Sequence, residues 1–313
     1  MSVRVGYMPG FLGREGQDPD YLRRLVAVGD KYHYDSIWFS DRIVSDRFSV
    51  EPMIALSMVA AYSQRLKLGT SVLAMPVRNP VLLAKQIATL DFLSQGRLLP
   101  FVGLGQEDPE EYEACGFTKH GRGPRTEEAI RLMRRLWQED HVTHQGPFFT
   151  CHDVTITPKP CSKPSPQVWI GGRSSAAARR VGRVGDGWLV SGATPEEIRV
   201  RRDIVFGTAK VHQREIENDH IGVILGYYIT PNAEGSVRKA HDYVARHRHD
   251  VHFTEYSALG PAQKVVETMQ RYVEAGADKF VVRPLCPAEE TIEQLEILGS
   301  EVLPQFPVYA AMR

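Results

Sequence analysis

The sequence predicts an α/β fold, specifically a (β/α)8 or TIM barrel. Short apolar or β-branched runs alternate with longer helical patterns along the 313 residues, and eight such runs can be counted. No linker rich in Gly, Ser or Pro divides the chain. We therefore expect a single domain over residues 1–313. An open doubly wound sheet remains the alternative, because periodicity does not show closure.

The expected elements follow from composition and from start and stop signals. The strands are expected at 3–8, 36–39, 67–72, 98–103, 168–172, 187–190, 221–229 and 279–283. The helices between them are expected at 20–31, 52–62, 80–93, 126–138, 174–183 and 261–275. Asn79-Pro80 begins one of these helices and Ala275-Gly276 ends another. Right-handed crossovers would place the C-terminal ends of all strands on one face.

Residues 143–166 interrupt this alternation. The segment contains five prolines, which prevent a long helix. Its first part resembles a hairpin turn followed by an irregular excursion. The insertion is expected either to shape substrate access at the barrel rim or to pack as a covering flap.

Composition excludes several classes of function. Lys plus Arg and Asp plus Glu both number 38, whereas a protein that binds nucleic acid or a membrane surface usually has a basic excess. The basic clusters at 199–202 and 246–249 are interpreted as solvated faces. The four cysteines show no metal-ligand spacing, which predicts no metal site and a reducing compartment. No leader segment and no apolar run of membrane-spanning length is recognised, so a cytoplasmic protein is expected.

Polar residues follow several of the expected strands, where barrel enzymes place their active sites. Asp41 and Arg42 follow the strand at 36–39, and Arg283 ends the last strand. For Asp41 and Arg42, a local ion pair or helix cap is the alternative to ligand binding. Gly105 belongs to a Gly-Leu-Gly run that suits close backbone approach to a flat molecule, although it lacks the third glycine of a dinucleotide motif.

The run from 167 to 177 predicts an anion site. An apolar segment ends at Gly171 and Gly172, and Arg173 and Ser174 lead into an alanine-rich helix. Glycines let the backbone approach a ligand closely, and the first N–H groups of the helix lack internal partners. Such a turn commonly holds a phosphate. An ordinary strand-to-helix turn capped by Ser174 is the alternative.

Taken together, the motifs resemble the luciferase-like flavin monooxygenase family over roughly residues 3–285. The matching stretches lie at 34–41, 65–72, 78–86, 91–97, 125–137, 158–160, 169–174, 185–188 and 274–278. The resemblance implies a (β/α)8 barrel with a reduced flavin or deazaflavin in its mouth. Family members are usually dimers, and apolar helix residues such as Val59, Ala60 and Leu82 would suit either that interface or a monomer's core.

The resemblance also implies roles for individual residues. Gly171, Gly172, Arg173 and Ser174 resemble the phosphate-binding turn, and Arg125 resembles an arginine near that phosphate. Ser71-Val72 resembles the bulge behind the ring, where relatives have a non-proline cis peptide bond. Asp41 resembles the residue beside the ring edge in deazaflavin members.

Two departures favour FMN over the deazaflavin coenzyme F420. Deazaflavin dehydrogenases usually have a His where this chain has Arg42, and those that act on sugars have a Glu in place of Gln106. The Ser71-Val72 pair is nevertheless typical of the deazaflavin branch.

The resemblance therefore implies a monooxygenase that uses reduced FMN and O₂ to oxygenate a small organic substrate, with a flavin reductase as a partner if the enzyme is of the two-component type. Arg42, Arg283 and Gln106 are the candidate catalytic residues. Both arginines would steady developing negative charge, although a salt bridge is the alternative for Arg283. The alternatives are hydride transfer with F420 and a catalytically silent flavin-binding protein. A phosphate-sugar aldolase or isomerase is disfavoured, because no strand-end Lys stands out.

Overall fold

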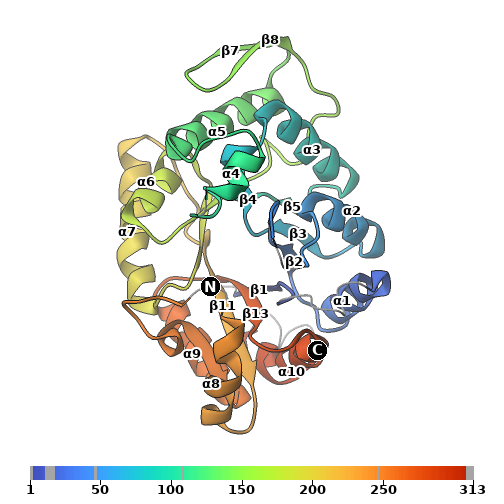
Figure 1. The fold of residues 1–313 in the computed structure, drawn as a ribbon, viewed down its shortest axis with the longest axis vertical. Coiled ribbons are helices and arrows are strands. Elements are labelled where there is room, and N and C mark those ends of the chain that lie inside the picture. The colour runs from blue at the N-terminus through green and yellow to red at the C-terminus, as the bar shows by residue number, and fades with distance from the viewer. Residues whose placement is uncertain (1–2, 11–17, 46–47, 108, 245–246, 308–313) are drawn as a thin grey trace.

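In the computed structural model, helices surround a central set of parallel strands (Figure 1). The structure describes residues 3–10, 18–45, 48–107, 109–244 and 247–307. No helix in these ranges is both long and apolar enough to cross a membrane.

The strands close into a barrel. In spatial order they are β1 (Arg4–Tyr7), β2 (Ser36–Phe39), β3 (Lys67–Thr70) with β4 (Leu73–Ala74), β5 (Leu98–Leu99) with β6 (Phe101–Gly103), β9 (Trp169–Gly171), β10 (Gly187–Ser191), β11 (Ile221–Ile229) and β13 (Lys279–Pro284). β3 pairs with β5, and β4 pairs with β6. β3 and β4 are therefore two parts of one interrupted strand, and β5 and β6 are two parts of the next. These two pairings join the ends of the sheet, which confirms the barrel and excludes the open doubly wound sheet.

The outer ring consists of eight helices in the described residues. They are α1 (Pro19–Lys31), α2 (Pro52–Tyr62), α3 (Pro80–Leu93), α5 (Arg122–Gln138), α6 (Ser175–Val184), α7 (Pro195–Val211), α9 (Ala262–Glu274) and α10 (Thr291–Ile297). Side-chain caps define several N-termini: Asn79 accepts from two N–H groups of α3, and Thr194 forms a capping box with Glu197 at the start of α7. The Asn79 cap explains why the start of α3 could be read from the sequence, whereas α7 was not among the expected helices.

Large and small residues complement one another inside the barrel. Trp38, Phe101, Trp169, Leu189 and Val281 come from five different strands and form one buried cluster. A Cβ on Gly69 would lie 2.0 Å from the Trp38 ring, and one on Gly187 would lie 2.4 Å from the Trp169 ring. The indoles therefore fill the interior only because glycines stand opposite them.

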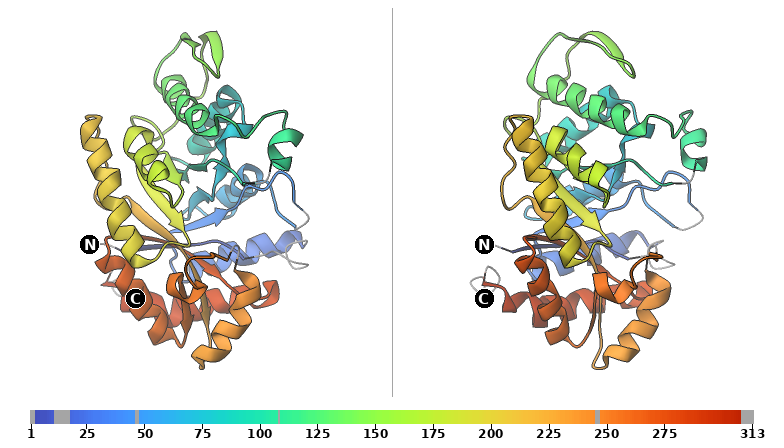
Figure 2. Two further views of the ribbon diagram at one scale, coloured as in Figure 1. Left: turned by 60° about the vertical axis from the view of Figure 1, so that its left-hand side comes forward. Right: turned by 90° about the vertical axis from the view of Figure 1, so that its left-hand side faces the viewer.

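The insertion after α5 begins at the end of the barrel opposite the mouth, and the tip of its hairpin packs back along α5 against Glu128 and Arg125. It begins with the antiparallel pair β7 (Val142–Gln145) and β8 (Thr150–Val154) and continues without helix or strand to residue 168. The hairpin stands out beyond α5 in both views of Figure 2. Lys159 donates to the Leu136 carbonyl (3.0 Å), and Ser162 donates to Asp91 on α3. The packing role predicted for residues 143–166 is therefore the one the structure supports, and no residue of the segment lines the two cavities described below.

A second excursion lies at the mouth itself. Between β11 and β12 (Ser257–Gly260) the chain forms α8 (Ala233–Ala240) and two short 3-10 turns, His241–Tyr243 and Phe253–Tyr256. β12 pairs in parallel with the last residues of β11, beside the barrel wall. Val244 and Tyr256 thereby reach the cavity described next.

Candidate functional site

Two adjoining cavities of about 550 Å³ each open at the C-terminal ends of the strands. They share a wall made by Val72, Gly105, Ser191, Ile224 and Arg283. We call the one lined by the β9–α6 turn the tail compartment and the one lined by Trp38, Asp41 and Ser71 the ring compartment. A molecule with a flat ring and an anionic tail would span both.

The tail compartment contains the anion turn that the sequence predicted. Gly171, Gly172, Arg173 and Ser174 line it, together with the first turn of α6. Gly172 has φ 124°, a conformation that favours glycine. The Ser174 hydroxyl accepts from the Ala177 N–H at 3.1 Å, so it caps the helix. The N–H groups of the preceding residues in that first turn have no helix-internal acceptor, and they can bind an anion.

Glycines line the passage between the two compartments, beside the Val72 side chain of their shared wall. A Cβ on Gly171 would lie 2.9 Å from the Phe101 ring and 3.3 Å from Val72. A Cβ on Gly103 would lie 2.6 Å from the Val72 side chain. These two glycines therefore make room for the Phe101 and Val72 side chains. Gly105, for which the sequence suggested close backbone approach to a flat molecule, lines both compartments and has φ 76°.

The bulge that separates β3 from β4 forms the floor of the ring compartment. The Ser71–Val72 peptide bond is cis, as the family resemblance implied. The Ser71 N–H donates to the Phe39 carbonyl at 2.7 Å. Its hydroxyl is buried and has no hydrogen-bond partner among the described residues. This hydroxyl suits a polar atom of a bound ring.

Asp41 lines the ring compartment, but its carboxylate is already occupied. Arg78 binds both oxygens, with Nη2 at 2.9 and 2.8 Å, and the Ala74 N–H donates to Oδ2 at 3.0 Å. The Asp41 side chain is only 2% exposed. Asp41 therefore forms an ion pair with Arg78, 37 residues away in sequence, and not the local ion pair that was stated as the alternative.

The three predicted catalytic residues all line the ring compartment. Arg42 and Gln106 are exposed, and Arg283 is half-buried in the wall that both compartments share. The Gln106 carbonyl accepts hydrogen bonds from Arg122 at 2.9 Å and from the Tyr112 hydroxyl at 3.2 Å. These bonds hold the Gln106 backbone in place, and the Gln106 side chain remains available to a ligand in the cavity.

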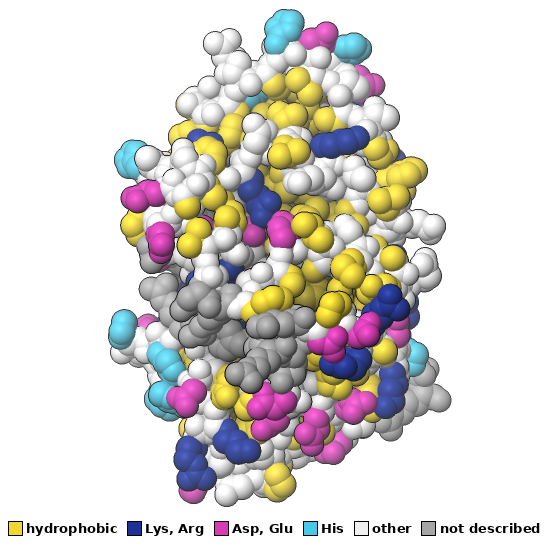
Figure 3. All heavy atoms as spheres, turned by 45° about the vertical axis from the view of Figure 1, so that its right-hand side comes forward, with side chains coloured by type: hydrophobic (Ala, Val, Ile, Leu, Met, Phe, Trp, Pro, Cys, Tyr) yellow, Lys and Arg dark blue, Asp and Glu magenta, His cyan; other side chains and the backbone are white. Residues whose placement is uncertain are grey.

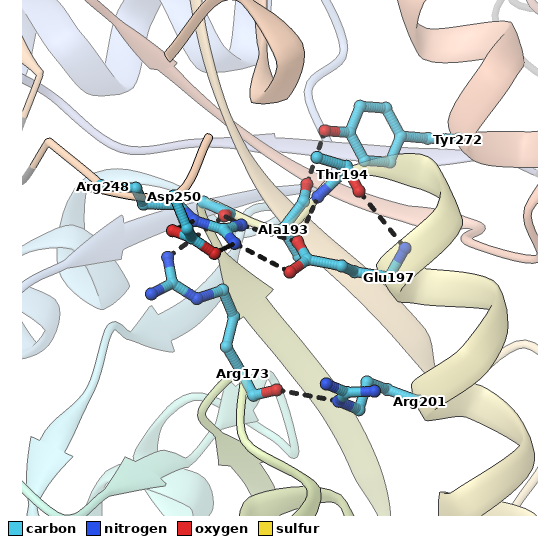
Figure 4. Close-up of polar contacts among 9 residues, drawn as sticks. Arg173, Ala193, Thr194, Glu197, Arg201, Arg248, Asp250 and Tyr272 are labelled. Atoms are coloured by element: carbon cyan, nitrogen blue, oxygen red, sulfur yellow. Dashed lines mark hydrogen bonds and ion pairs between the residues drawn. The ribbon is translucent and has the colours of Figure 1, made fainter. Parts of the chain in front are cut away.

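The Arg173 side chain turns away from the anion turn toward the β10–α7 loop. Its Nη1 donates to the Gly192 carbonyl at 3.2 Å (Figure 4). Arg248 donates to the same carbonyl and forms a bidentate pair with Glu197 at 2.7 and 2.9 Å. Burial, with the nearby Arg248 charge adding to it, lowers the pKa of Arg173.

The interpretation of residues 246–249 as a solvated face is wrong for Arg248. Its side chain is only 5% exposed and is bound by Glu197 and Asp250. Hydrogen bonds to these carboxylates raise its pKa. The pairing ties the excursion before β12 to the start of α7. Arg246 lies outside the described residues.

Arg125 does not line either compartment. Its guanidinium lies over the rings of Phe117 and Phe149, 4.4 and 4.7 Å from their centroids. Arg122, one helical turn earlier, lines the tail compartment instead, and so does Arg180 of α6. Sequence reasoning missed both residues, as well as Tyr256, because no motif marks them. A signal was present for Arg180, since it follows Ala176 and Ala177 at helical spacing.

One cluster of potential metal ligands occurs among the described residues. Glu217, Asp219 and His220 bring their ligand atoms within 4.8 Å of one another. The cluster precedes β11, at the end of the barrel opposite the mouth. Asp219 pairs with Arg4 at 3.1 Å, and His220 contacts the Asp186 carbonyl at 2.7 Å. Protein contacts thus account for part of this cluster.

Comparison with known proteins identifies the family. The family model described as luciferase-like monooxygenase matches residues 5–279. The chain belongs to this family. Members of the luciferase-like monooxygenase family are flavin- or F420-dependent oxidoreductases, so the chain belongs to a family of enzymes.

Relatives with both kinds of cofactor are found within the luciferase-like family. The chain is 32% identical over 177 residues to an F420-dependent glucose-6-phosphate dehydrogenase of Kineococcus radiotolerans, covering 55% of the chain and 52% of the relative. It is 30% identical over 211 residues to an FMNH(2)-dependent dimethylsulfone monooxygenase of Pseudomonas putida, covering 65% and 57%. These matches span little more than half the length of either relative.

The structural likeness extends over the whole barrel. A monooxygenase, RslO1 from Streptomyces bottropensis, superposes with a TM-score of 0.82 at 19% identity, covering 96% of this chain and 99% of that one. At this identity the likeness establishes the fold.

Proposed function

We propose that the protein is a monooxygenase that uses reduced FMN and O₂ to oxygenate a small organic substrate. One observation carries this choice within the family. Among the described residues of the ring compartment, the only carboxylate is Asp41, and Arg78 holds it; no His, Glu, Lys, Tyr or Cys is present. Oxidation of an alcohol by hydride removal needs a base to take the hydroxyl proton. Oxygenation does not depend on such a base.

The described residues fit a flavin. The unpartnered Ser71 hydroxyl and the glycine-lined passage suit the ring, and the first turn of α6 suits a phosphate. Bound reduced FMN would supply the electrons that activate O₂, so that one oxygen atom enters the substrate and the other leaves as water. The protein's contribution would be to hold the ring, orient the substrate and exclude bulk water.

Arg42, Arg283 and Gln106 would act on the substrate side of the ring. Their side chains lie in a compartment whose walls also include the apolar side chains of Trp38 and Ile224. Cations and an amide in such surroundings stabilise negative charge that develops during oxygen transfer. We assign this role to the two arginines, with Gln106 orienting the substrate.

Hydride transfer with coenzyme F420 is the second candidate. Two observations favour hydride transfer. The Ser71-Val72 sequence at the bulge is typical of deazaflavin-dependent members, and one relative named above is F420-dependent. Both cofactors carry a three-ring system and a phosphate-bearing tail, so the same compartments would serve either.

The deciding experiment is a titration of the purified protein with FMN, reduced FMN and F420, followed by oxygen uptake on a substrate panel. Tighter binding of reduced FMN with substrate-dependent oxygen consumption supports the proposal. Tight F420 binding without oxygen consumption would replace it with the second candidate. Flavin binding without turnover on any electron donor would indicate a catalytically silent flavin-binding protein.

We also propose that the protein forms a homodimer through α2 and α3. Figure 3 shows hydrophobic side chains gathered on the face that carries these helices. The exposed ones are Ile54, Met58, Leu82, Phe92 and Leu93, at 39 to 67% exposure. Leu82 was expected for such an interface, whereas Val59 is fully buried and belongs to the core. A flavin reductase is a further proposed partner, required if reduced FMN arrives from solution.

A further inference from the structure

We propose that Glu217, Asp219 and His220 bind a divalent transition-metal ion, with Zn²⁺ as the reference ion, at the end of the barrel opposite the mouth. The three side chains bring ligand atoms within 4.8 Å of one another. None of them lines the tail or the ring compartment, so the ion has a structural role and the inference does not depend on the flavin function.

A tight turn brings the three side chains together. Residues 217–220 lie between α7 and β11, and the His220 N–H donates to the Glu217 carbonyl at 3.0 Å, which closes a four-residue β-turn. The His220 carbonyl accepts from the Trp188 N–H of β10 at 2.9 Å, so the end of the turn is attached to the barrel wall. Backbone hydrogen bonds therefore set the positions of the ligand side chains.

His220 is buried and presents one ring nitrogen to the two carboxylates. Its side chain is only 6% exposed. Nδ1 lies 2.7 Å from the Asp186 carbonyl oxygen, which can only accept, so in the neutral ring Nδ1 carries the proton and Nε2 carries the lone pair. Metal-binding histidines commonly donate their other ring N–H to a backbone carbonyl in this way. Nε2 itself forms no hydrogen bond with a described residue.

The distances around Nε2 fit a shared ion better than a direct ion pair. Glu217 Oε2 lies 3.5 Å from Nε2, and Asp219 Oδ1 lies 3.9 Å from it. A hydrogen bond between charged groups is about 2.7–2.9 Å long. Ligand atoms held about 2.0–2.2 Å from one tetrahedral zinc ion lie about 3.3–3.6 Å from one another. The Asp219 side chain is 48% exposed, so it has room for the small movement that completes this geometry.

Arg4 occupies one oxygen of Asp219 and leaves the other to the ion. Its Nη2 lies 3.1 Å from Asp219 Oδ2 and also donates to the Asp219 carbonyl, whereas Oδ1 is the oxygen that faces His220. A partner of this kind orients a carboxylate that binds a metal. Among the described residues, the Glu217 carboxylate pairs with no cation other than His220. Two carboxylates beside one arginine and a neutral imidazole leave a net negative charge, which favours a cation.

The types of ligand select the class of ion. A neutral imidazole with carboxylates suits Zn²⁺ and its neighbours in the first transition row, whereas Ca²⁺ and Mg²⁺ prefer sites built from oxygen alone. Three protein ligands leave one position of a tetrahedral ion for water. The cluster contains no cysteine, so the cysteine spacing from which the sequence predicted no metal site does not bear on it.

The test is a calorimetric titration of chelator-treated full-length protein with Zn²⁺, together with thermal scans. Zinc should raise the Tm of the wild type by several degrees, because the ion binds the folded turn and not the unfolded chain. Glu217→Gln should lower the zinc affinity by about tenfold or more and remove most of the Tm rise. Glu217 is 68% exposed, so this variant should fold. Glu215→Gln is the matched control: it removes an equal charge from an exposed position two residues away and should change neither quantity.

A neighbouring indole supplies a second readout. The ring centroids of Trp169 and His220 lie 5.1 Å apart. Ni²⁺ bound at His220 Nε2 should therefore quench part of the tryptophan emission of the wild type, and His220→Gln should lose this quenching. His252→Gln removes an exposed histidine from another segment and should keep it. Glu217→Gln, which should also lose the quenching, decides the matter if His220→Gln fails to fold.

Calcium distinguishes a transition-metal site from an exposed acidic turn. Ca²⁺ should raise the Tm of the wild type no more than that of Glu217→Gln, because imidazole is a poor ligand for it. The inference is overturned if zinc raises the Tm of the wild type and of Glu217→Gln equally. It is also overturned if Ni²⁺ quenching persists in both His220→Gln and Glu217→Gln, or if Ca²⁺ stabilises the wild type as much as Zn²⁺ does.

Discussion

Asp278 should make the barrel less stable as the pH rises. Its carboxylate lies at the start of β13 in a residue that is 1% exposed, and neither oxygen has a hydrogen-bond partner among the described residues. The nearest cation, Arg4, places Nη2 3.8 Å from Oδ1. Burial, opposed by Arg4 and reinforced by the charge of Asp219, raises the pKa of Asp278 from 3.8 to about 7.

The sign of the effect follows from proton binding. Between pH 4 and pH 7 the folded protein retains a proton that the unfolded chain has released. The free energy of unfolding therefore falls as the pH rises through this range and levels off above it. A shift of about 3 pKa units corresponds to about 4 kcal/mol at pH 8.

Asp278→Asn removes this dependence, because the amide is neutral at every pH and nearly isosteric with the carboxylic acid. We expect the variant to match the wild type at pH 4 and to exceed it by up to about 4 kcal/mol at pH 8. For a chain of this length that is a Tm increase of about 8 °C. Calorimetric scans from pH 4 to 8.5 would measure it.

Glu274→Gln provides the control for Asp278→Asn. Glu274 is exposed at the end of α9, so its neutral replacement should leave the pH profile of the wild type unchanged. The reasoning would be refuted if the free energy of unfolding depended on pH in the same way in the wild type and in Asp278→Asn. It would also be refuted if Asp278→Asn were less stable than the wild type at pH 8.

Three further predictions concern the site and the surface. Gly171→Ala places a methyl group 2.9 Å from the Phe101 ring and should weaken flavin binding by about tenfold or more, as read by fluorescence quenching; unchanged affinity would mean that this passage is not used. Arg78→Met leaves the buried Asp41 carboxylate uncompensated and should cost about 3–5 kcal/mol of stability, which addition of Asp41→Asn should partly restore. Leu82→Glu should convert a dimer to a monomer in light scattering, and a dimer that survives the substitution would place the interface elsewhere.

Local signals explain which elements the sequence predicted well. α2 and α3 begin and end at the predicted residues, since Pro52 and Pro80 occupy first-turn positions after capping side chains. The helix expected to begin at Thr126 starts instead at Arg122, because a proline is tolerated in the first turn. Closure of the barrel could not be predicted, because it depends on pairing between distant strands.

The candidate site was predicted where backbone requirements leave a trace in the sequence. The glycines at 171 and 172 and the bulge at Ser71 line the cavities as expected. Side-chain partners leave no comparable trace. The pairing of Asp41 with Arg78 and the burial of Arg248 both arise from segments far apart in sequence, so neither could be read from local composition.

The hairpin of β7 and β8 braces a helix that also reaches the candidate site. The N–H groups of Phe148 and Phe149 at its tip donate to Glu128 on α5, and the Phe149 ring lies beside the Arg125 guanidinium. Arg122, one turn before Arg125, lines the tail compartment. Substitutions at the tip can therefore shift the beginning of α5 and alter ligand binding, although no residue of the hairpin touches the cavity.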